Sequence, residues 1–379
     1  MHVVVSKKDL LRILNRCQGV ADKKSTMPVL GNVLLEAQAG SIQLSATDLY
    51  VAVRGSVKAE VEQPGTIAVG ARDLFERVKM MPEGQVSIST SEGAATTIRA
   101  VGSARRYTLH GIPGDEFPKL PAPDDAAPSM SLPVDTLHDL IAKTHFSIST
   151  DETRLHLNSA LFEWDGERVR MVTTDGHRLS KMEVSVPGKN ATATMLIPNK
   201  GIQELKRLCE EARSEKTDEA SPELTMTQSG PNAFFSLGGF QFSVKLVDAQ
   251  FPPYQRVIPE QTERAIRAPK DAVQEALGAV SVAASDRTGG VKLTITEDKI
   301  RFESESPESG AGFDEIAVDY RGAEVTVGFN ARYFIDVLKV VDDDEVILGI
   351  SGELDPAVVR PAHEDTTKNH VAVIMPMRI

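Results

Sequence analysis

Six segments of this chain share one pattern, a short extended apolar run that leads into an amphipathic helix. They cover residues 3–14, 66–79, 130–143, 194–208, 267–280 and 325–338. Successive starts differ by 63, 64, 64, 73 and 58 residues. Recurrence at such even spacing indicates that one supersecondary unit is reused along the chain. Function is therefore expected to lie in the arrangement of the modules more than in a single catalytic cluster.

The first of these segments shows why each is predicted to contain a one-sided helix. Leu10, Leu14 and Cys17 follow one another at i, i+4 and i+7. This spacing places an apolar stripe on one face, while the basic Lys8 and Arg12 occupy another. The helix is therefore expected to pack on a sheet and to expose its basic face.

Two proline-rich stretches, residues 113–128 and 252–259, divide the chain into three parts of similar length with two repeats in each. Short runs with period-two patterning, such as residues 41–57 and 168–186, follow the helices and predict antiparallel strands. We expect an α+β fold of three pseudo-equivalent domains, each with two helices on antiparallel sheet. Two acidic stretches, residues 210–222 and 303–315, are predicted to be exposed loops.

The composition is typical of a globular protein with two to four domains. The chain has 379 residues, of which 41% are hydrophobic and 25% charged. It contains no apolar run near the ~18 residues of a membrane span and no secretory leader. Only two cysteines occur, Cys17 and Cys209, both in predicted helices and expected to be small buried hydrophobes. These features predict a reduced, cytoplasmic protein.

Charge is unevenly distributed along the sequence. The net charge is −12, yet residues 7–24 carry +4, and the six predicted helical segments together carry +7 against −19 elsewhere. A basic helical face on an acidic body is thus expected, a distribution suited to contact with phosphate groups.

The sequence lacks a strong catalytic signature, since it has no phosphate-binding loop, nucleophile elbow or zinc-protease motif. His138 and His145 lie seven residues apart on one helix without further ligands, so no metal or cofactor is expected. The densest polar cluster runs from Thr173 to Arg178. Its Asp175 and His177 suit acid–base chemistry, whereas Asp-Gly also suits a tight turn between strands. The similar run at Asp48 favours the turn.

The chain ends in an apolar segment, residues 370–379, with methionines at 375 and 377. Termini more often fray into polar tails. Two interpretations stay open, a final strand docked in its own domain and a recognition surface to which methionine lends adaptability.

Several motifs together resemble the family of bacterial DNA polymerase III β subunits, the replicative sliding clamps. They are PVLGN (28–32), TDGHRL (174–179), KLVDAQFPPYQRVIP (245–259), GFNARYFIDVL (328–338) and the terminal MPMRI. They occur in the family's order and cover the whole chain.

The resemblance implies three domains of the DNA clamp fold, at residues 1–121, 129–252 and 253–379. It implies a head-to-tail homodimer, a closed ring with twelve helices around duplex DNA and sheets outside. The implied activity is that of a non-enzymatic processivity factor without a cofactor. The implied partners are DNA, a second copy, the DNA polymerase III alpha subunit, the clamp loader, and other polymerases and repair proteins that carry clamp-binding peptides.

The resemblance also implies three sets of site residues. The hydrophobic peptide pocket would include Leu157, Thr174, Gly176, His177, Arg178, Leu179, Pro252, Arg256, Val257, Asn330, Tyr333, Val373, Met375, Pro376, Met377, Arg378 and Ile379. The DNA-facing positions would be Lys24, Arg72, Arg154, Asn199 and Lys200, and the helix pattern adds Lys8, Arg12 and Arg16. The dimer contact would pair Tyr107 and Leu109 of one chain with Val282 and Ala283 of the other.

Two other classes of function stay open at this stage. One is an enzyme that uses Asp175 and His177 at a domain junction. The other is a repeat-built scaffold that never meets DNA.

Overall fold

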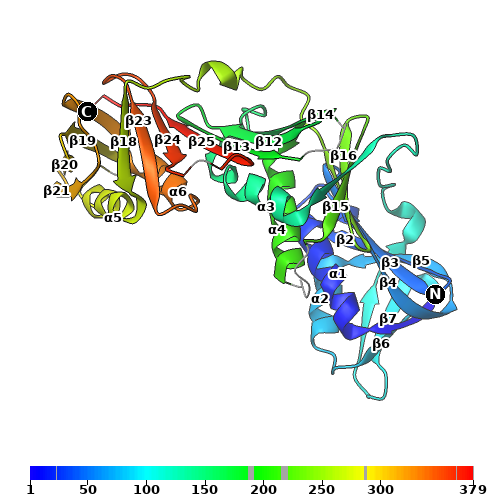
Figure 1. Ribbon diagram of the computed structural model, residues 1–379. Helices are drawn as coiled ribbons and strands as arrows, with labels where there is room; N and C mark the ends of the chain where they lie inside the picture. The colour runs from blue at the N-terminus through cyan, green and yellow to red at the C-terminus, as the bar shows by residue number, and fades with distance from the viewer. Residues whose placement is uncertain (23, 187–191, 215–220, 286–287, 364, 379) are drawn as a thin grey trace. The chain divides into compact units, whose positions relative to one another are not determined.

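The computed structural model describes residues 1–22, 24–186, 192–214, 221–285, 288–363 and 365–378 (Figure 1). Each of the six predicted segments is a strand followed directly by an α-helix, so this prediction is confirmed. The strand–helix pairs are β1 (His2–Ser6) with α1 (Lys7–Val20), β5 (Gly65–Gly70) with α2 (Ala71–Lys79), β10 (Ser129–Pro133) with α3 (Val134–Ala142), β14 (Thr192–Pro198) with α4 (Asn199–Ser214), β18 (Arg264–Pro269) with α5 (Lys270–Ser281), and β22 (Val325–Asn330) with α6 (Ala331–Leu338).

Helix α1 begins where Ser6 caps its first turn, because the Ser6 hydroxyl accepts a hydrogen bond of 3.4 Å from the backbone N–H of Asp9. The predicted stripe is buried, with Leu10, Leu14 and Cys17 fully shielded from solvent. Leucine side chains buried to this degree each stabilise the fold by about 1.5–3 kcal/mol. The amphipathic reading of the sequence is therefore confirmed for this helix.

The chain forms two compact units. The first comprises Met1–Pro133 and Pro222–Leu246, and the second Val134–Ser221 and Val247–Ile379. Each unit is thus built from two separate stretches of the chain, and each has its own sheets.

The first unit contains one 13-stranded antiparallel sheet with α1 and α2 packed against each other. Its main path is β10-β15-β16-β17-β4-β1-β6-β7-β8, and β2, β3, β5 and β9 branch from it. Its remaining strands are β2 (Asn32–Gln38), β3 (Ser41–Thr47), β4 (Val51–Gln63), β6 (Gln85–Thr90), β7 (Ala95–Ala100), β8 (Arg106–His110), β9 (Ile112–Pro113), β15 (Glu223–Ser229), β16 (Asn232–Leu237) and β17 (Phe240–Lys245).

The second unit contains an eight-stranded sheet in the order β14-β11-β12-β13-β25-β24-β23-β18 and a four-stranded sheet in the order β21-β20-β19-β22. In Figure 1 the final strand, β25, lies beside β13 within the larger sheet. The remaining strands of the second unit are β11 (Ser159–Asp165), β12 (Arg168–Thr174), β13 (Arg178–Ser185), β19 (Gly290–Thr296), β20 (Lys299–Ser306), β21 (Gly310–Ala317), β23 (Glu345–Ile350), β24 (Ala357–Pro361) and β25 (Lys368–Ile374).

Helices α5 and α6 pack together in the second unit, over a core rich in aromatic rings. Phe302, Phe329 and Phe334 are fully buried there. The rings of Phe329 and Phe334 meet edge to face with centroids 5.1 Å apart, a favoured aromatic arrangement. This packing fixes α6, which carries several of the site residues described below.

Two predicted loops are wrong in the described parts. Most of residues 303–315 belongs to the hairpin of β20 and β21, because alternate residues of β20 are buried although the stretch is acidic. Residues 210–214 continue α4, and 215–220 lie outside the described residues.

The predicted charge contrast is also too large. The six observed helices hold 13 basic and 11 acidic side chains, a net charge of +2 in place of +7. Five helices each lose one unit of charge relative to the predicted segments. Helix α4 includes Glu210 and Glu211, α1 ends before Lys24, and α3, α5 and α6 leave out Lys143, Arg267 and Lys339. The basic excess is concentrated on α1, at +3.

Both cysteines are buried as expected, and burial raises the pKa of the Cys209 thiol to about 12. No helix in the described parts of the chain is long and apolar enough to cross a lipid bilayer.

Candidate functional site

The polar cluster at residues 174–178 forms a closed turn between β12 and β13. The Thr174 hydroxyl donates a hydrogen bond of 2.6 Å to the carbonyl oxygen of Arg178 and accepts one of 3.1 Å from the Gly176 N–H. Asp175 Oδ1 accepts hydrogen bonds from the N–H groups of His177 at 2.9 Å and Arg178 at 3.0 Å. The turn interpretation is therefore confirmed, since the short side chains cap the backbone of the turn.

Glycine at position 176 is favoured by the backbone. Its φ is +90°, a left-handed conformation that most side chains adopt only with strain. A Cβ built at Gly176 would meet no atom within 4 Å, so the surrounding space does not exclude a larger residue. The conformation alone accounts for the glycine.

Arg178 connects the turn to α6 and to the segment after α3. Its Nε donates to Asp175 Oδ2 at 3.1 Å, one terminal nitrogen donates to Asp336 Oδ2 at 2.7 Å, and the other donates to the Phe146 carbonyl oxygen at 2.6 Å. Its guanidinium carbon lies 4.6 Å from the centroid of the Tyr333 ring, within the range of a cation–π interaction. Arg178 is only 10% exposed, so these contacts are largely shielded from water.

Tyr333 contacts both Arg178 and His177. Its ring stacks on the His177 imidazole at an interplanar angle of 17° with centroids 6.4 Å apart. Burial raises the pKa of the Tyr333 phenol, and the nearby carboxylate of Asp175 raises it further. The phenol therefore stays neutral and offers a mostly apolar face near the turn.

The C-terminal strand completes this region. In β25, Val373 pairs with Leu179 and Ile374 with Arg178, which places the end of the chain against the turn. The backbone N–H of Met375 then donates to the His177 carbonyl oxygen at 2.9 Å. The docked-strand interpretation of the apolar tail is thus confirmed as far as Ile374, and Met375 beyond it is 38% exposed.

A small apolar cluster lies under the turn and the tail. Its buried members are Leu161, Val172, Leu179, Leu196, Phe251, Tyr254 and Val373. The Tyr254 hydroxyl donates to Glu163 Oε2 at 2.8 Å, and burial raises the pKa of this phenol to about 12. The cluster gives the candidate site a rigid hydrophobic base.

The predicted pocket residues differ in exposure. The buried ones are Leu157, Thr174, Leu179 and Val373. The partly buried ones are Arg178, Pro252, Asn330, Tyr333, Pro376 and Met377. The exposed ones are Gly176, His177, Arg256, Val257, Met375 and Arg378. Ile379 lies outside the described residues.

The described contacts bring the turn, the tail and the start of α6 together. Asn330 caps α6 by accepting a hydrogen bond of 3.0 Å from the Arg332 N–H, and the Met377 N–H donates to the Gly328 carbonyl oxygen at 2.7 Å. Pro252 and Arg256 join this region through their neighbours Phe251 and Tyr254 in the apolar cluster.

Two residues that hold the site together were not identified from the sequence. They are Asp336 and Phe146, which bind Arg178 through a carboxylate and a main-chain carbonyl. Asp336 lies three residues after Tyr333 on α6, and this spacing places both on one helix face. That spacing was the available signal for Asp336, whereas nothing in the sequence marked the carbonyl of Phe146.

The DNA-facing candidates of the first unit lie mainly on α1. Lys8 and Arg12 are exposed, and the Arg16 guanidinium lies 4.2 Å from the centroid of the Phe240 ring. Lys24 and Arg72 are also exposed.

Lys7 does not belong to the basic face of α1, although the sequence count included it. It is 7% exposed, and its Nζ donates to the Met81 carbonyl oxygen and to Glu83 Oε1, both at 2.7 Å. Lys23, also counted there, lies outside the described residues.

The DNA-facing candidates of the second unit are Arg154, Asn199 and Lys200. Arg154 forms an ion pair of 3.0 Å with Asp151, and both side chains are about half exposed. Asn199 begins α4, and Lys200 is exposed on its first turn.

The dimer candidates lie at or near strand edges. Within the described residues β8, which holds Tyr107 and Leu109, pairs only with β7, and β21 pairs only with β20. Val282 is 79% exposed at the end of α5, whereas Ala283 is buried beside Gly312 of β21. An unpaired strand edge beside an exposed valine is a surface suited to pairing with another chain.

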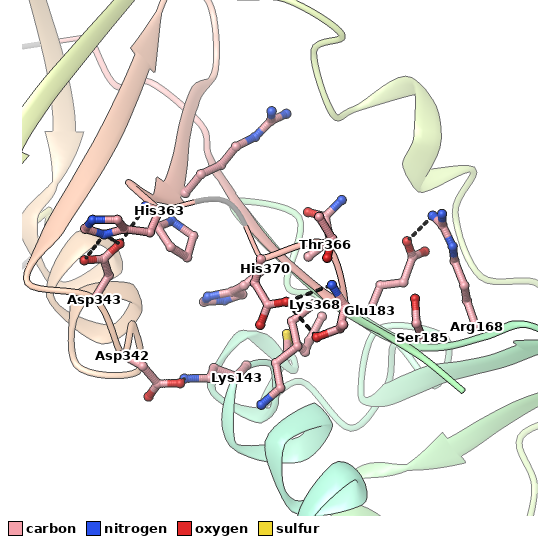
Figure 2. A pocket seen from close by; sticks show the side chains of 16 residues that line it. Lys143, Arg168, Glu183, Ser185, Asp342, Asp343, His363, Thr366, Lys368 and His370 are labelled. Atoms are coloured by element: carbon pink, nitrogen blue, oxygen red, sulfur yellow. Dashed lines mark hydrogen bonds and ion pairs between the residues drawn. The ribbon is translucent and has the colours of Figure 1, made fainter. Parts of the chain in front are cut away.

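A cavity of about 560 Å³ lies at the other end of the β13–β25 ladder (Figure 2). Its charged side chains form ion pairs, among them Lys143 with Asp342 at 2.5 Å, Arg168 with Glu183 at 3.0 Å and His363 with Asp343 at 2.7 Å. His370 also lines the cavity, and burial lowers the pKa of its imidazole to about 4. None of the predicted site residues lines this cavity.

Acid–base chemistry finds little support in the turn. Asp175 uses both carboxylate oxygens to hold the turn and Arg178, so it is a structural acceptor. Within the described parts of the chain no group of three or more histidine, cysteine or acidic residues could hold a metal ion.

The chain is similar to known proteins along its whole length. Family models of the DNA polymerase III beta subunit match residues 1–121 (N-terminal domain), 131–253 (central domain) and 255–378 (C-terminal domain). The beta sliding clamp of Escherichia coli K12 is 30% identical over 382 residues, and that of Pseudomonas putida is 31% identical over 381. In both comparisons the two chains are covered completely.

Solved structures are similar over the same extent. The DNA polymerase III subunit beta of Pseudomonas aeruginosa is 30% identical with a TM-score of 0.90. The sliding clamp of Bartonella birtlesii, in a structure bound to griselimycin, is 32% identical with a TM-score of 0.92. Both alignments cover all of each chain.

Proposed function

Because this chain belongs to the family of DNA polymerase III beta subunits, the beta sliding clamps, we propose that two copies close head to tail into a ring around duplex DNA. Family membership confirms the predicted α+β fold with three similar clamp domains. The protein is a sliding clamp, a non-catalytic processivity factor of DNA replication. The main support is that the three domain models together match nearly every residue of the chain.

Contact with DNA would come from basic side chains that attract phosphates without reading bases. Exposed Lys8, Arg12, Lys24 and Arg72 supply such charges in the first unit, and Lys200 in the second. A sliding protein needs weak, diffuse attraction of this kind, because strong or base-specific contacts would stop it at one place. Arg154 would contribute less, since its ion pair with Asp151 offsets its charge.

Ring closure would join the edge of β8 in one copy to the edge of β21 in the other. Tyr107 and Leu109 lie on β8, and the exposed Val282 lies near β21. Pairing the two edges would satisfy their open backbone groups, and burying Val282 would add apolar contact.

Partner proteins would bind where the turn, the tail and α6 meet. The side chains exposed there include Val257 and Met375, over the buried cluster of Leu179, Phe251 and Val373. Such a rigid apolar base suits the few anchor side chains that give a short peptide most of its affinity. The other candidate pocket residues would border this base.

The expected partners are the DNA polymerase III alpha subunit, the clamp loader, and further polymerases and repair proteins with clamp-binding peptides, all in the cytoplasm. The sequence contains no nucleotide-binding P-loop, so the energy for opening the ring would come from another protein. Related clamps were crystallised with griselimycin, and we expect this chain to bind it as well.

Retention on circular DNA is the decisive experiment. The loaded protein should stay on a closed circle and leave within minutes once a restriction enzyme linearises it, because topology holds it in place. Equal retention on the circle and the cut DNA would refute a topological clamp. A monomeric mass in solution together with no retention on either DNA would favour the scaffold alternative.

The enzyme alternative is tested by His177→Ala. In a clamp this change weakens binding of the alpha subunit, since it removes the ring stacked on Tyr333. A reaction catalysed by the purified protein and abolished by His177→Ala would overturn the clamp reading of this site.

A further inference from the structure

We propose that Asp336 is a positioning residue of the peptide site, which holds Arg178 under Tyr333 and withholds its charge from carboxylates of the ligand. This inference rests on the proposed function, because it concerns the specificity of the same site. It predicts that the site prefers apolar peptide side chains because its central arginine is already bound.

The chain contains a natural comparison for this site in the turn between β3 and β4. There the Thr47 hydroxyl donates to the Val51 carbonyl oxygen at 2.8 Å, and the Leu49 N–H donates to the Thr47 hydroxyl at 2.9 Å. Asp48 Oδ1 accepts from the N–H groups of Tyr50 at 2.9 Å and Val51 at 2.7 Å. Each bond has its counterpart at Thr174 and Asp175.

The equivalence extends to the neighbouring strand. The Lys245 N–H donates to the Tyr50 carbonyl oxygen at 2.8 Å, as the Met375 N–H does to that of His177 at 2.9 Å. In the first unit β17 pairs with β4, as β25 pairs with β13 in the second. The backbone framework therefore does not distinguish the two turns.

The side chain after the turn does distinguish them. The first turn continues with Val51, which has no polar group, whereas the second continues with Arg178. The first turn also has Leu49 at φ +75° where the second has Gly176 at +90°. What is particular to the second turn is thus the arginine and the groups that bind it.

Arg178 directs all three guanidinium nitrogens to acceptors within the protein. They bind Asp175, Asp336 and the Phe146 carbonyl oxygen. The side chains of Asp175 and Asp336 are 16% and 22% exposed, so their ion pairs are partly protected from water. With two carboxylates beside it, the guanidinium is poorly available to a third from a ligand.

Asp336 also positions the Arg178 guanidinium relative to Tyr333. Because it lies one helical turn after Tyr333, it holds the guanidinium against the ring of that tyrosine, 4.6 Å from the ring centroid. Tyr333 also stacks with His177. The arrangement of Arg178 with Tyr333 and His177 therefore depends on the Asp336 contact.

The test compares Asp336→Asn and Asp336→Ala with the wild-type protein in binding to the purified DNA polymerase III alpha subunit. A second assay uses two labelled hexapeptides. One carries two leucines and a phenylalanine, and in the other an aspartate replaces one leucine. Asp344→Asn, at an exposed acidic residue in the loop after α6, is the charge-matched control.

We expect Asp336→Ala to weaken the apolar peptide and the alpha subunit about tenfold, because Arg178 loses a partly buried partner. Asp336→Asn keeps a hydrogen-bond acceptor and should lower the affinity for the apolar peptide and the alpha subunit about threefold. The affinity for the acidic peptide relative to the apolar one should rise by a similar factor. Asp344→Asn should behave as the wild type. In an Arg178→Gln background, Asp336→Asn should no longer change the ratio of the two peptides.

The outcomes separate the inference from the function on which it rests. If the wild type binds neither the alpha subunit nor the apolar peptide, the peptide site itself is refuted. If the wild type binds and Asp336→Asn leaves both the affinities and their ratio unchanged, the role of Asp336 is refuted. An equal loss of affinity for both peptides, together with a lowered melting temperature, would also refute it, because the effect would then be purely structural. If Asp336→Ala does not fold, Asp336→Asn and the double variant decide the question.

Discussion

The backbone N–H of Met375 donates a hydrogen bond of 2.9 Å to the carbonyl oxygen of His177, and this bond joins the last residues of the chain to a turn almost 200 positions earlier. It continues the β13–β25 ladder one step past Ile374. The tail therefore leaves the sheet beside the Asp175 turn, with Met375 partly exposed. The proposed peptide site depends on this junction.

Met375→Ala should weaken binding of the DNA polymerase III alpha subunit about tenfold, because an exposed apolar anchor is lost while the main-chain bond to His177 remains. Surface plasmon resonance with the purified subunit measures this loss. Met80→Ala, at a methionine that is 52% exposed in the first unit, is the matched control and should leave affinity unchanged. Equal losses for the two variants would contradict a role for the tail.

Gly176→Ala should lower the free energy of unfolding by about 1 kcal/mol, since alanine is strained at a φ of +90°. Gly278→Ala, within α5, should have the opposite sign and add about 0.5–1 kcal/mol. Neither new Cβ would meet an atom within 4 Å, so backbone conformation is the variable tested. Urea denaturation of both variants provides the comparison, and effects of the same sign would disprove the conformational account.

Lys8→Gln should reduce the salt dependence of DNA affinity, with the slope of log K against log salt falling by about 1 if one phosphate contact is lost. Lys7→Gln should leave that slope unchanged, because Lys7 is buried. It should instead destabilise the fold by about 1–3 kcal/mol, since the Met81 carbonyl and Glu83 lose their partner. Fluorescence anisotropy over a salt series separates the two lysines, and identical slopes for both variants would argue against α1 as a DNA-facing helix.

Val282→Glu should raise the dimer dissociation constant about 100-fold or more, because closure would bury an unpaired charge. The fold itself should keep its melting temperature, since this side chain is 79% exposed. Analytical ultracentrifugation measures the dimer. Tyr50→Glu, at a side chain that is 67% exposed, serves as the control. An unaltered dimer in the Val282 variant would place the interface elsewhere.

Acid should destabilise the protein through His370. Burial lowers the pKa of this imidazole to about 4 from 6.5, and the Lys143 charge lowers it too, whereas Asp342 acts in the opposite direction. Between these values the unfolded chain binds more protons than the folded one. The free energy of unfolding should therefore fall as pH drops from about 6.5 to about 4, by up to about 3 kcal/mol.

His370→Gln should flatten this pH dependence, while His110→Gln, at an exposed histidine, should leave it in place. Urea unfolding at half-unit pH steps gives the curves. A slope that persists in the His370 variant would assign the acid sensitivity to other groups.

The regular parts of the fold were predictable because local patterns determine them. The α1 stripe at Leu10, Leu14 and Cys17 and the Asp-Gly turn at Asp175 both follow from short-range spacing. The hairpin of β20 and β21 was missed because its acidic residues lie at partly or fully exposed positions, and the buried β20 residues within the predicted loop, Ser304 and Ser306, are polar and give no alternating apolar pattern.

Long-range contacts were harder to foresee. Nothing in the spacing of Lys7 and Lys8 shows that the first binds Met81 and Glu83 while the second faces solvent. The Arg178–Asp336 pair spans 158 residues and depends on where α6 packs, so only the identity of its arginine was accessible from the motif. The resemblance named Arg178 and Tyr333, but the carboxylate that orients them required the structure.

The β13–β25 pairing has a consequence for how this C-terminus can change in evolution. From Val184 with Lys368 to Arg178 with Ile374, seven consecutive pairs set one register, and side chains alternate between the two faces of the sheet. Inserting or deleting a single residue in this strand would turn Val371 and Val373 to the opposite face and shift Met375 away from the turn. The C-terminal strand should therefore tolerate substitutions better than changes in length.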